Sequence, residues 1–182
     1  MKHLTVKEKE AESFEKMKSE FHYKNAMAAP HLQKVVVNTG TGTLMKKDKN
    51  KNDAIADRLA KISGQKAALR GAKQSISSFK VRQGDPIGAM VTLRGSRMYA
   101  FLEKLINVAL PRTKDFRGIK RTAVDNIGNL TIGIKEHTIF PETADEDIRD
   151  VFGLAITIVS SAKTKPEGLA FFQNLGVPFK KD

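Results

Sequence analysis

Residues 75–95, with the sequence SISSFKVRQGDPIGAMVTLRG, contain the two features from which the rest of the chain can be interpreted. In the second half, hydrophobic residues alternate with small or polar ones. Ile87, Ala89, Val91 and Leu93 share one parity, and Gly88, Met90, Thr92 and Arg94 share the other. A period of two residues is typical of a half-buried strand. The sequence therefore predicts a strand here, with one hydrophobic face and one face of small or polar residues.

The first half of this stretch is a polar, basic loop. It contains Phe79, Lys80 and Arg82 and ends in the turn signal Gly84-Asp85-Pro86. Because the loop leads directly into the strand, we interpret the loop and the polar strand face as two contact surfaces for nucleic acid.

Length and composition set the limits of the interpretation. The chain has 182 residues, of which 40% are hydrophobic, enough for one ordinary domain with a core. No run approaches the ~18 apolar residues of a membrane span, and the N-terminal residues lack an apolar signal region, so we expect a cytosolic protein. The absence of cysteines excludes disulfides, thiolate nucleophiles and cysteine-type zinc sites.

The charge favours a polyanionic partner. The formal net charge is +12, which favours salt-dependent binding to a phosphate backbone. A basic protein without a role in nucleic-acid binding is the alternative that charge alone leaves open. An anionic membrane is disfavoured, because no stretch combines a wide apolar face with a face of Lys and Arg.

Periodicity predicts the other elements. Helices are expected at residues 5–21, where Thr5 and Glu8 form a capping-box pattern, and at 53–63, 96–110 and 166–175. Strands are expected at 31–39, around Leu130 to Ile134, and at 153–161.

Aligning the strands by parity predicts two layers. The hydrophobic sides are Ile87, Val91 and Leu93, then Leu130, Ile132 and Ile134, then Leu154, Ile156 and Ile158. Helices would cover this side, giving an α+β fold: two layers, a mainly antiparallel sheet and helices packed on one face. The opposite side carries small hydrogen-bonding residues such as Thr92 and Thr131, with Asn38 joining from the first strand. Such a face suits ribose hydroxyls and base edges; an ordinary solvent-facing sheet side is the alternative.

Two further basic loops accompany the loop near 72–84. One lies near 43–51 and is rich in Lys. The other, near 111–122, places Arg112, Lys114 and Arg117 around Phe116 without any period. It is a candidate contact for RNA or protein, or else a solvated loop. We expect all three loops and the N-terminal helix to belong to a single domain over residues 1–182.

No enzyme, cofactor or metal site emerges from the motifs. The four histidines lack metal-ligand spacing. Met45 stands where a dinucleotide fingerprint starting at Gly40 needs its third glycine. The acidic cluster Glu142, Asp145, Glu146 and Asp147 is best explained as the first turn of a short helix. We therefore expect no catalysis and no small-molecule substrate.

Five segments carry a resemblance to a known family: Val35–Gly42 (VVVNTGTG), Ile62–Lys66 (ISGQK), Ser75–Gly95, Asp115–Gly118 (DFRG) and Ile139–Glu142 (IFPE). In this order, and over nearly the whole chain, they resemble the L5 family of bacterial large-subunit ribosomal proteins. The blocks FKVRQGDPIG and DFRG are highly specific to that family.

The resemblance implies a structural protein of the cytoplasmic ribosome with an antiparallel sheet and helices on one face. Members of this family bind 5S rRNA and attach it in the central protuberance. They contact P-site tRNA through a basic loop and small-subunit ribosomal protein S13 across an intersubunit bridge. The implied partners also include large-subunit rRNA and neighbouring 5S-associated ribosomal proteins. A basic protein-interaction module without specific RNA binding is the alternative function.

The resemblance also indicates site residues. The rRNA-binding candidates are Asn38, Gln65, Thr92, Lys34 and Arg94. The tRNA-facing loop corresponds to Lys73 through Arg82, with Lys73, Ser77, Ser78, Phe79, Lys80 and Arg82 as candidates. The bridge or RNA loop candidates are Arg112, Lys114, Phe116 and Arg117.

The chain departs from the family pattern at three places. His31 follows Pro30, the proline before the first expected strand, at a position where the family often has Arg. The basic loop from Lys46 to Lys51 is longer and richer in Lys than usual, and the acidic segment after Pro141-Glu142 diverges.

Overall fold

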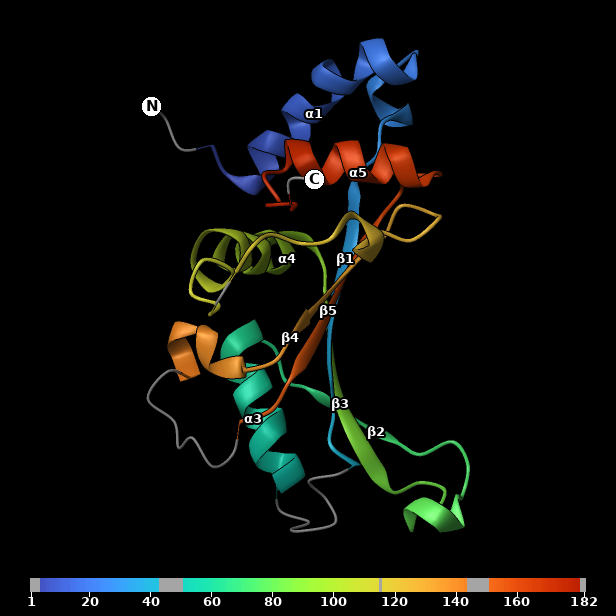
Figure 1. Cartoon of the computed structure of the whole chain (residues 1–182), viewed down its shortest axis with the longest axis vertical. Helices are drawn as coiled ribbons and strands as arrows, with labels where there is room; N and C mark the ends of the chain where they lie inside the picture. Colours follow the sequence, from blue (N-terminus) through green and yellow to red (C-terminus); the bar gives the residue numbers. More distant parts are fainter. Residues whose placement is uncertain (1–3, 43–50, 115, 144–150, 181–182) are drawn as a thin grey trace. The chain divides into compact units, whose positions relative to one another are not determined.

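The computed structural model describes residues 4–42, 51–114, 116–143 and 151–180. Its strands form one sheet in the order β2-β3-β1-β5-β4 (Figure 1). The elements are α1 (Val6–Phe21), β1 (Leu32–Gly40), α3 (Lys51–Ser63), β2 (Ala68–Gly71), β3 (Pro86–Leu93), α4 (Gly95–Lys104), β4 (Leu130–Ile134), β5 (Leu154–Ser160) and α5 (Lys165–Asn174). A five-stranded antiparallel sheet, with four α-helices among the described residues, confirms the predicted α+β fold class. None of the helices in the described ranges is long and apolar enough to cross a membrane.

Contacts within the chain define two compact units. Unit 1 comprises Met1–Val35, Arg94–Ile132 and Thr157–Asp182, and unit 2 comprises Val36–Leu93 and Gly133–Ile156. Strands β1, β4 and β5 contribute residues to both units. The expectation of a single domain over the whole chain stays a prediction.

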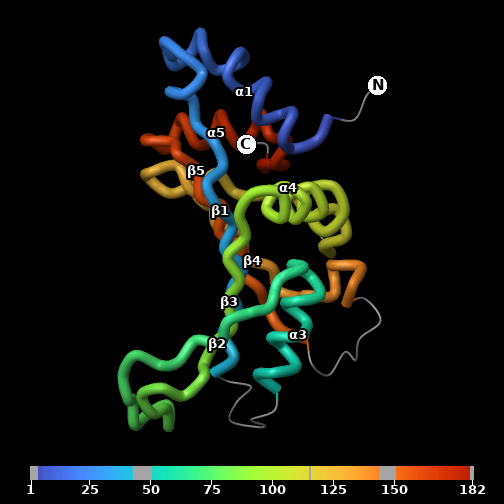
Figure 2. Tube along the Cα trace, turned by 180° about the vertical axis from the view of Figure 1, so that it is seen from behind, coloured from blue at the N-terminus to red at the C-terminus, as the bar shows by residue number. Residues whose placement is uncertain are grey.

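Unit 1 contains helices α1, α4 and α5 together with parts of three strands. The predicted capping box is present: the Thr5 hydroxyl accepts the Glu8 N–H, and the Glu8 carboxylate accepts the Thr5 N–H at 2.7 Å. Helix α1 packs against α5 and α4, and α1 and α5 lie side by side in both views (Figures 1 and 2). The predicted helix over 96–110 is α4 followed by a π-helical turn, Leu105–Ala109, in which the Leu110 N–H donates to the Leu105 carbonyl.

Two carboxylates join segments of unit 1 that are far apart in sequence. Glu10 of α1 accepts hydrogen bonds from the Tyr99 hydroxyl at 2.6 Å and from the Leu32 N–H at 2.7 Å. Glu167 accepts hydrogen bonds from the Tyr23 hydroxyl and, at 2.7 Å, from the Lys163 N–H. Burial, followed by the bond to Glu10, raises the pKa of Tyr99 to about 12. Each carboxylate therefore satisfies a hydroxyl and a backbone donor at once.

In the described residues of unit 2, helix α3 packs on a sheet. Ile55, Leu59 and Ile62 of α3 are buried, and α3 packs against β3 and β2 (Figure 1). Burial alternates along β3 as the sequence predicts: Ala89, Val91 and Leu93 are buried, and the residues between them are half-buried. The same alternation is seen in β4 and β5. At the start of β3, however, Ile87 is half-buried rather than part of the core.

Strand β2 was not predicted. It pairs antiparallel with β3, with Ala68 opposite Met90, Leu69 opposite Ala89 and Arg70 opposite Gly88. All four of its residues are exposed, so the sequence has no hydrophobic alternation there. A short strand at the edge of a sheet leaves little sequence signal, because its register is set by its partner.

Candidate nucleic-acid interface

The side of the unit 2 sheet opposite α3 carries mostly small side chains. Because facing residues of an antiparallel pair project to the same side, the register places Ala68 and Arg70 beside Met90 and Gly88. We call this surface the open face: Val36, Asn38, Gly40, Ala68, Arg70, Gly88, Met90 and Thr92, all exposed or half-buried. A surface with so few long side chains can lie close to a bulky partner.

Three of the five residues predicted to bind rRNA, Asn38, Gln65 and Thr92, lie in unit 2. Asn38 is exposed between buried Val37 and Thr39, and Thr92 is half-buried between Val91 and Leu93. Gln65 follows Gly64, whose positive φ of 68° ends α3. The Gln65 Nε2 donates to the Thr92 carbonyl at 3.2 Å. Gln65 therefore fastens the end of α3 to β3, beside Thr92.

Arg70 is the residue of the open face that sequence reasoning missed. It is exposed and its cross-strand partner, Gly88, has no side chain. An added Cβ at Gly88 would meet the Thr39 carbonyl oxygen at 3.0 Å, so packing within the sheet explains this glycine. The only available signal was the basic character of the segment around Arg70, since β2 itself is not evident from the sequence.

The predicted basic loop between β2 and β3 is an ordered hairpin, which we call the arm (residues 72–85). In both views it extends beyond the ends of β2 and β3 (Figures 1 and 2). Backbone bonds join Ile76 and Val81 in both directions, at 2.9 and 3.2 Å, and Ala72 pairs with Asp85. Side chains add two more: the Ser75 hydroxyl accepts the Gln83 N–H, and the Asp85 carboxylate accepts the Arg82 N–H at 2.8 Å.

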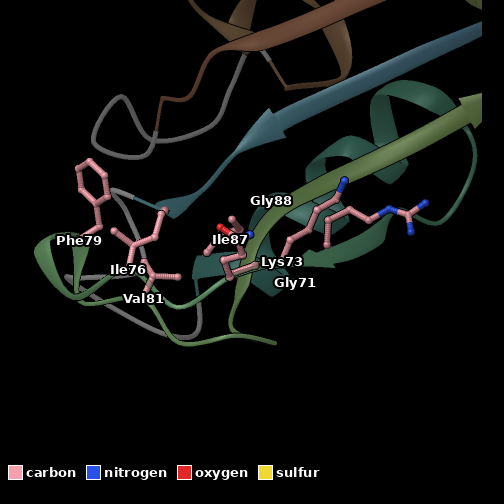
Figure 3. A pocket seen from close by; sticks show the side chains of 11 residues that line it. Gly71, Lys73, Ile76, Phe79, Val81, Ile87 and Gly88 are labelled. Atoms are coloured by element: carbon pink, nitrogen blue, oxygen red, sulfur yellow. The ribbon is translucent and has the colours of Figure 1, made fainter.

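The arm presents the side chains predicted from the family resemblance. Lys73, Ser77, Ser78, Phe79, Lys80 and Arg82 are all exposed. Ser77–Phe79 form a short 3-10 turn, and Lys80 follows it with a positive φ of 53°. Next to the turn lies a pocket that involves the arm, β2 and β3 (Figure 3).

The second basic loop is held by the C-terminal residues. We call residues 111–114 and 116–121 the tail-bound loop. The Ile119 N–H donates to the Pro178 carbonyl at 2.8 Å, and the Lys180 N–H donates to the Ile119 carbonyl at 2.9 Å. Ile119 is buried, and Phe116 is half-buried. Arg112, Lys114 and Arg117 are exposed around these anchors.

The remaining predicted site residues fall elsewhere. Lys34 is half-buried on β1 and Arg94 is the exposed N-cap of α4, and both belong to unit 1. The Lys-rich segment 46–50 and the acidic residues Asp145 to Asp147 lie outside the described residues. Within the described ranges, no three His, Cys, Asp or Glu residues are placed to hold a metal ion.

Two family models together match most of the chain. The model described as ribosomal protein L5 matches residues 25–82. A model of the C-terminus of the ribosomal L5 family matches residues 86–179. The boundary between them falls at the end of the arm.

Curated relatives match over almost their whole length, and each is called large ribosomal subunit protein uL5. The relative from Trichlorobacter lovleyi is 50% identical over 93% of this chain and 94% of its own. The relative from Mycoplasma mycoides is 51% identical over 89% of each chain. That from Halothermothrix orenii is 48% identical over 91% of this chain and 92% of its own.

Proposed function

We propose, from the premise that this chain belongs to the ribosomal protein L5 family, that it binds 5S rRNA through the open face and tRNA through the arm. Membership makes the chain a structural protein of the large ribosomal subunit rather than an enzyme, located in the cytoplasmic ribosome. Its contacts with particular RNAs and proteins are the proposal.

The observation that carries the proposal is the pairing of two unlike surfaces within unit 2. The open face has short side chains with one cation, Arg70, and it has hydrogen-bonding groups in Asn38 and Thr92. Small polar groups suit the shallow minor groove of an RNA helix, where ribose hydroxyls and base edges are displayed. We assign this face to 5S rRNA, which the protein would help attach in the central protuberance together with large-subunit rRNA and neighbouring 5S-associated proteins.

The arm suits a different contact. Its cations Lys73, Lys80 and Arg82 stand on a narrow hairpin rather than on a sheet, so they can reach a single backbone segment. Cations at the tip of a narrow element bind phosphates and position an RNA without reading its helix. We assign the arm to the P-site tRNA.

The tail-bound loop is the third proposed contact. Arg112, Lys114 and Arg117 form an exposed basic cluster that is fixed to the C-terminal residues at Ile119. We assign it to small-subunit protein S13 across an intersubunit bridge.

The open-face assignment can be tested by filling the face. Asn38→Trp and Thr92→Trp each place a large side chain where the proposal needs a close approach. We expect each to weaken binding to a bacterial 5S rRNA transcript by at least about tenfold, as for a central interface position. Binding is measured by filter retention or anisotropy at fixed salt, and folding by circular dichroism.

Ala54→Trp is the matched control. Ala54 is exposed on α3, which covers the other face of the same sheet, and the change is also from a small neutral residue to Trp. The control should bind 5S rRNA like the parent protein. Unchanged affinity of both open-face variants, with the fold intact, would refute the assignment.

A further inference from the structure

A pocket of about 820 Å³ lies in unit 2 between the arm and the nearby ends of the sheet strands (Figure 3). Its size falls within the roughly 300–1,000 Å³ of sites that enclose a small organic molecule. Ile76 and Val81 of the arm and Ile87 of β3 provide the large aliphatic side chains of its described lining. These three residues have no part in the RNA contacts proposed above, so the pocket is a separate candidate for a ligand site.

The labelled side chains of the lining follow one another along the pocket. Figure 3 shows them in the order Phe79, Ile76 with Val81, Ile87 and Lys73. Arg70 also lines the pocket, and its cross-strand partner is Gly88, the residue that follows Ile87. A ligand that fills the pocket therefore meets aliphatic groups along most of its length and positive charge at the Ile87 end.

The aliphatic side chains of the pocket are only partly shielded from water. Ile76 is 44% exposed, and Val81 and Ile87 are half-buried. Exposed apolar side chains that cluster around a hollow are typical of binding sites. A nonpolar group that covers these three side chains would remove apolar surface from water and gain free energy by doing so.

The remaining side chains define the rest of the ligand. The ring of Phe79 points away from Ile87 and Lys73, so a group held between those two residues cannot stack on it (Figure 3). No Asp or Glu is among the described residues of the lining. Lys73 and Arg70 therefore favour a negatively charged end group, which a carboxylate provides. The chemistry of the lining thus suits an aliphatic body with an acidic head.

Backbone hydrogen bonds hold both ends of the pocket. Ile76 and Val81 bond to each other in both directions, at 2.9 and 3.2 Å. At the other end, the Thr41 N–H donates to the Ile87 carbonyl at 2.8 Å and so joins the residue after β1 to β3. Because the lining is ordered before binding, a ligand can enter with little loss of conformational entropy in the protein.

We propose that this pocket binds a small amphipathic anion. Its elongated apolar body lies against Ile76, Val81 and Ile87, and its carboxylate or similar acidic group lies at Lys73 and Arg70. The inference goes beyond the proposed RNA contacts and does not depend on them.

Two probes of equal chain length test the proposal: dodecanoate, and dodecyltrimethylammonium with the opposite charge, each kept below its micelle concentration. We expect the full-length protein to bind dodecanoate at one saturable site and at least about tenfold more tightly than the ammonium, because the cations attract one head group and repel the other. Calorimetry measures both affinities. Methyl NMR of the parent protein should show shifts at Ile76, Val81 and Ile87, whereas Ile127, 62% exposed in unit 1, should not shift.

Substitutions test the two ends of the pocket. Ile87→Ala should weaken dodecanoate binding about fivefold, because an aliphatic contact is lost. Lys73→Ala should weaken it about threefold, as for an exposed ion pair. Ile127→Ala and Lys24→Ala are the matched controls, since both residues are exposed and lie in unit 1, and neither should change the affinity. Circular dichroism checks folding, and the methyl shifts of the parent protein locate the site independently of any variant.

Three results would overturn the proposal. The first is equal affinity for the two probes, and the second is a set of methyl shifts outside the pocket. The third is tighter binding of an acidic, leucine-containing peptide than of dodecanoate at the same methyl groups, which would indicate a protein partner instead.

A further variant separates the pocket from the proposed RNA contact of the arm. Lys80→Ala/Arg82→Ala should bind dodecanoate like the parent protein, because neither residue lines the pocket. Weaker dodecanoate binding by this variant would mean that the net charge of the arm attracts the probe, against the proposal. Loss of tRNA affinity with unchanged dodecanoate binding would support both assignments, and unchanged tRNA affinity would count against the RNA contact alone.

Discussion

The arm and the tail-bound loop have the same kind of sequence but are held in different ways. Both place several cations around one phenylalanine. The arm is a hairpin that bonds to itself, and it leaves Phe79 58% exposed. The tail-bound loop is anchored at buried Ile119 to residues near the C-terminus, and its Phe116 is half-buried. A basic segment with one aromatic residue can therefore either expose that residue to solvent or partly bury it against the rest of the protein.

The two units also differ in the side chains that join segments distant in sequence. In unit 1, the carboxylates of Glu10 and Glu167 link segments that are distant in sequence. In unit 2, two links between distant segments involve only neutral groups: Gln65 donates to the Thr92 carbonyl, and the Thr39 hydroxyl donates to the Gly153 carbonyl at 2.7 Å. The link between Gln65 and Thr92 adds no negative charge beside the open face, which we assign to 5S rRNA.

The largest expected effect tests how the two basic segments are anchored. Gly118 has φ = 93°, and an added Cβ would lie 2.6 Å from the Lys180 backbone nitrogen. Gly118→Ala should lower the free energy of unfolding by about 3 kcal/mol, because backbone strain and overlap add together. Gly84 of the arm has φ = 90° but nothing within 4 Å, so Gly84→Ala should cost only about 1–2 kcal/mol of strain. Urea unfolding measures both, and equal losses would contradict the difference in anchoring.

Sequence patterns correctly predicted the structural features that depend on interactions between residues close in sequence. The capping box of Thr5 and Glu8 and the alternation along β3 each depend on neighbours within a few residues, and both are confirmed. The predicted alternation also gave the correct face of the sheet for Asn38 and Thr92.

What the sequence could not predict depends on partners far along the chain. Tyr99 and Glu10 are 89 residues apart, and no periodicity relates them. Strand β2 forms by pairing with β3, and the register of this pairing places Arg70 on the open face. The pocket likewise needs the arm and β3 together. The sequence thus predicted which segments carry the candidate site residues. Which of those residues lie together could be known only from the three-dimensional structure.

The second prediction tests function in the same two segments with matched charge loss. Lys80→Ala/Arg82→Ala and Arg112→Ala/Arg117→Ala each remove two exposed positive charges. The arm pair should weaken binding to a tRNA transcript about tenfold and lower the slope of log K against log salt by about 1.4, for two lost phosphate contacts. The tail-bound pair should spare tRNA and weaken capture of protein S13.

Both pairs should leave 5S rRNA affinity close to that of the parent protein, since neither lies on the open face. Equal loss of tRNA binding in the two variants would mean that only net charge matters, and the distinction between the segments would fail.

The smallest expected effect tests the carboxylate joints of unit 1. The chain has two tyrosines, and Tyr23 and Tyr99 both lie in that unit. Tyr99→Phe removes the bond to Glu10 and should cost about 1 kcal/mol at neutral pH. The pKa of Tyr99 is raised to about 12 in the folded state, chiefly by burial, against about 10 in an unfolded chain.

The contribution of Tyr99 is therefore complete below pH ~10 and is lost as the pH rises through about 12. The stability difference between the parent protein and Tyr99→Phe should shrink over this range, measured by urea unfolding at several alkaline pH values. A difference independent of pH would refute the account of the joint. Affinity for 5S rRNA at neutral pH should not change, because the joints of unit 2 contain no tyrosine; a loss there would mean that the two units do not hold their surfaces independently.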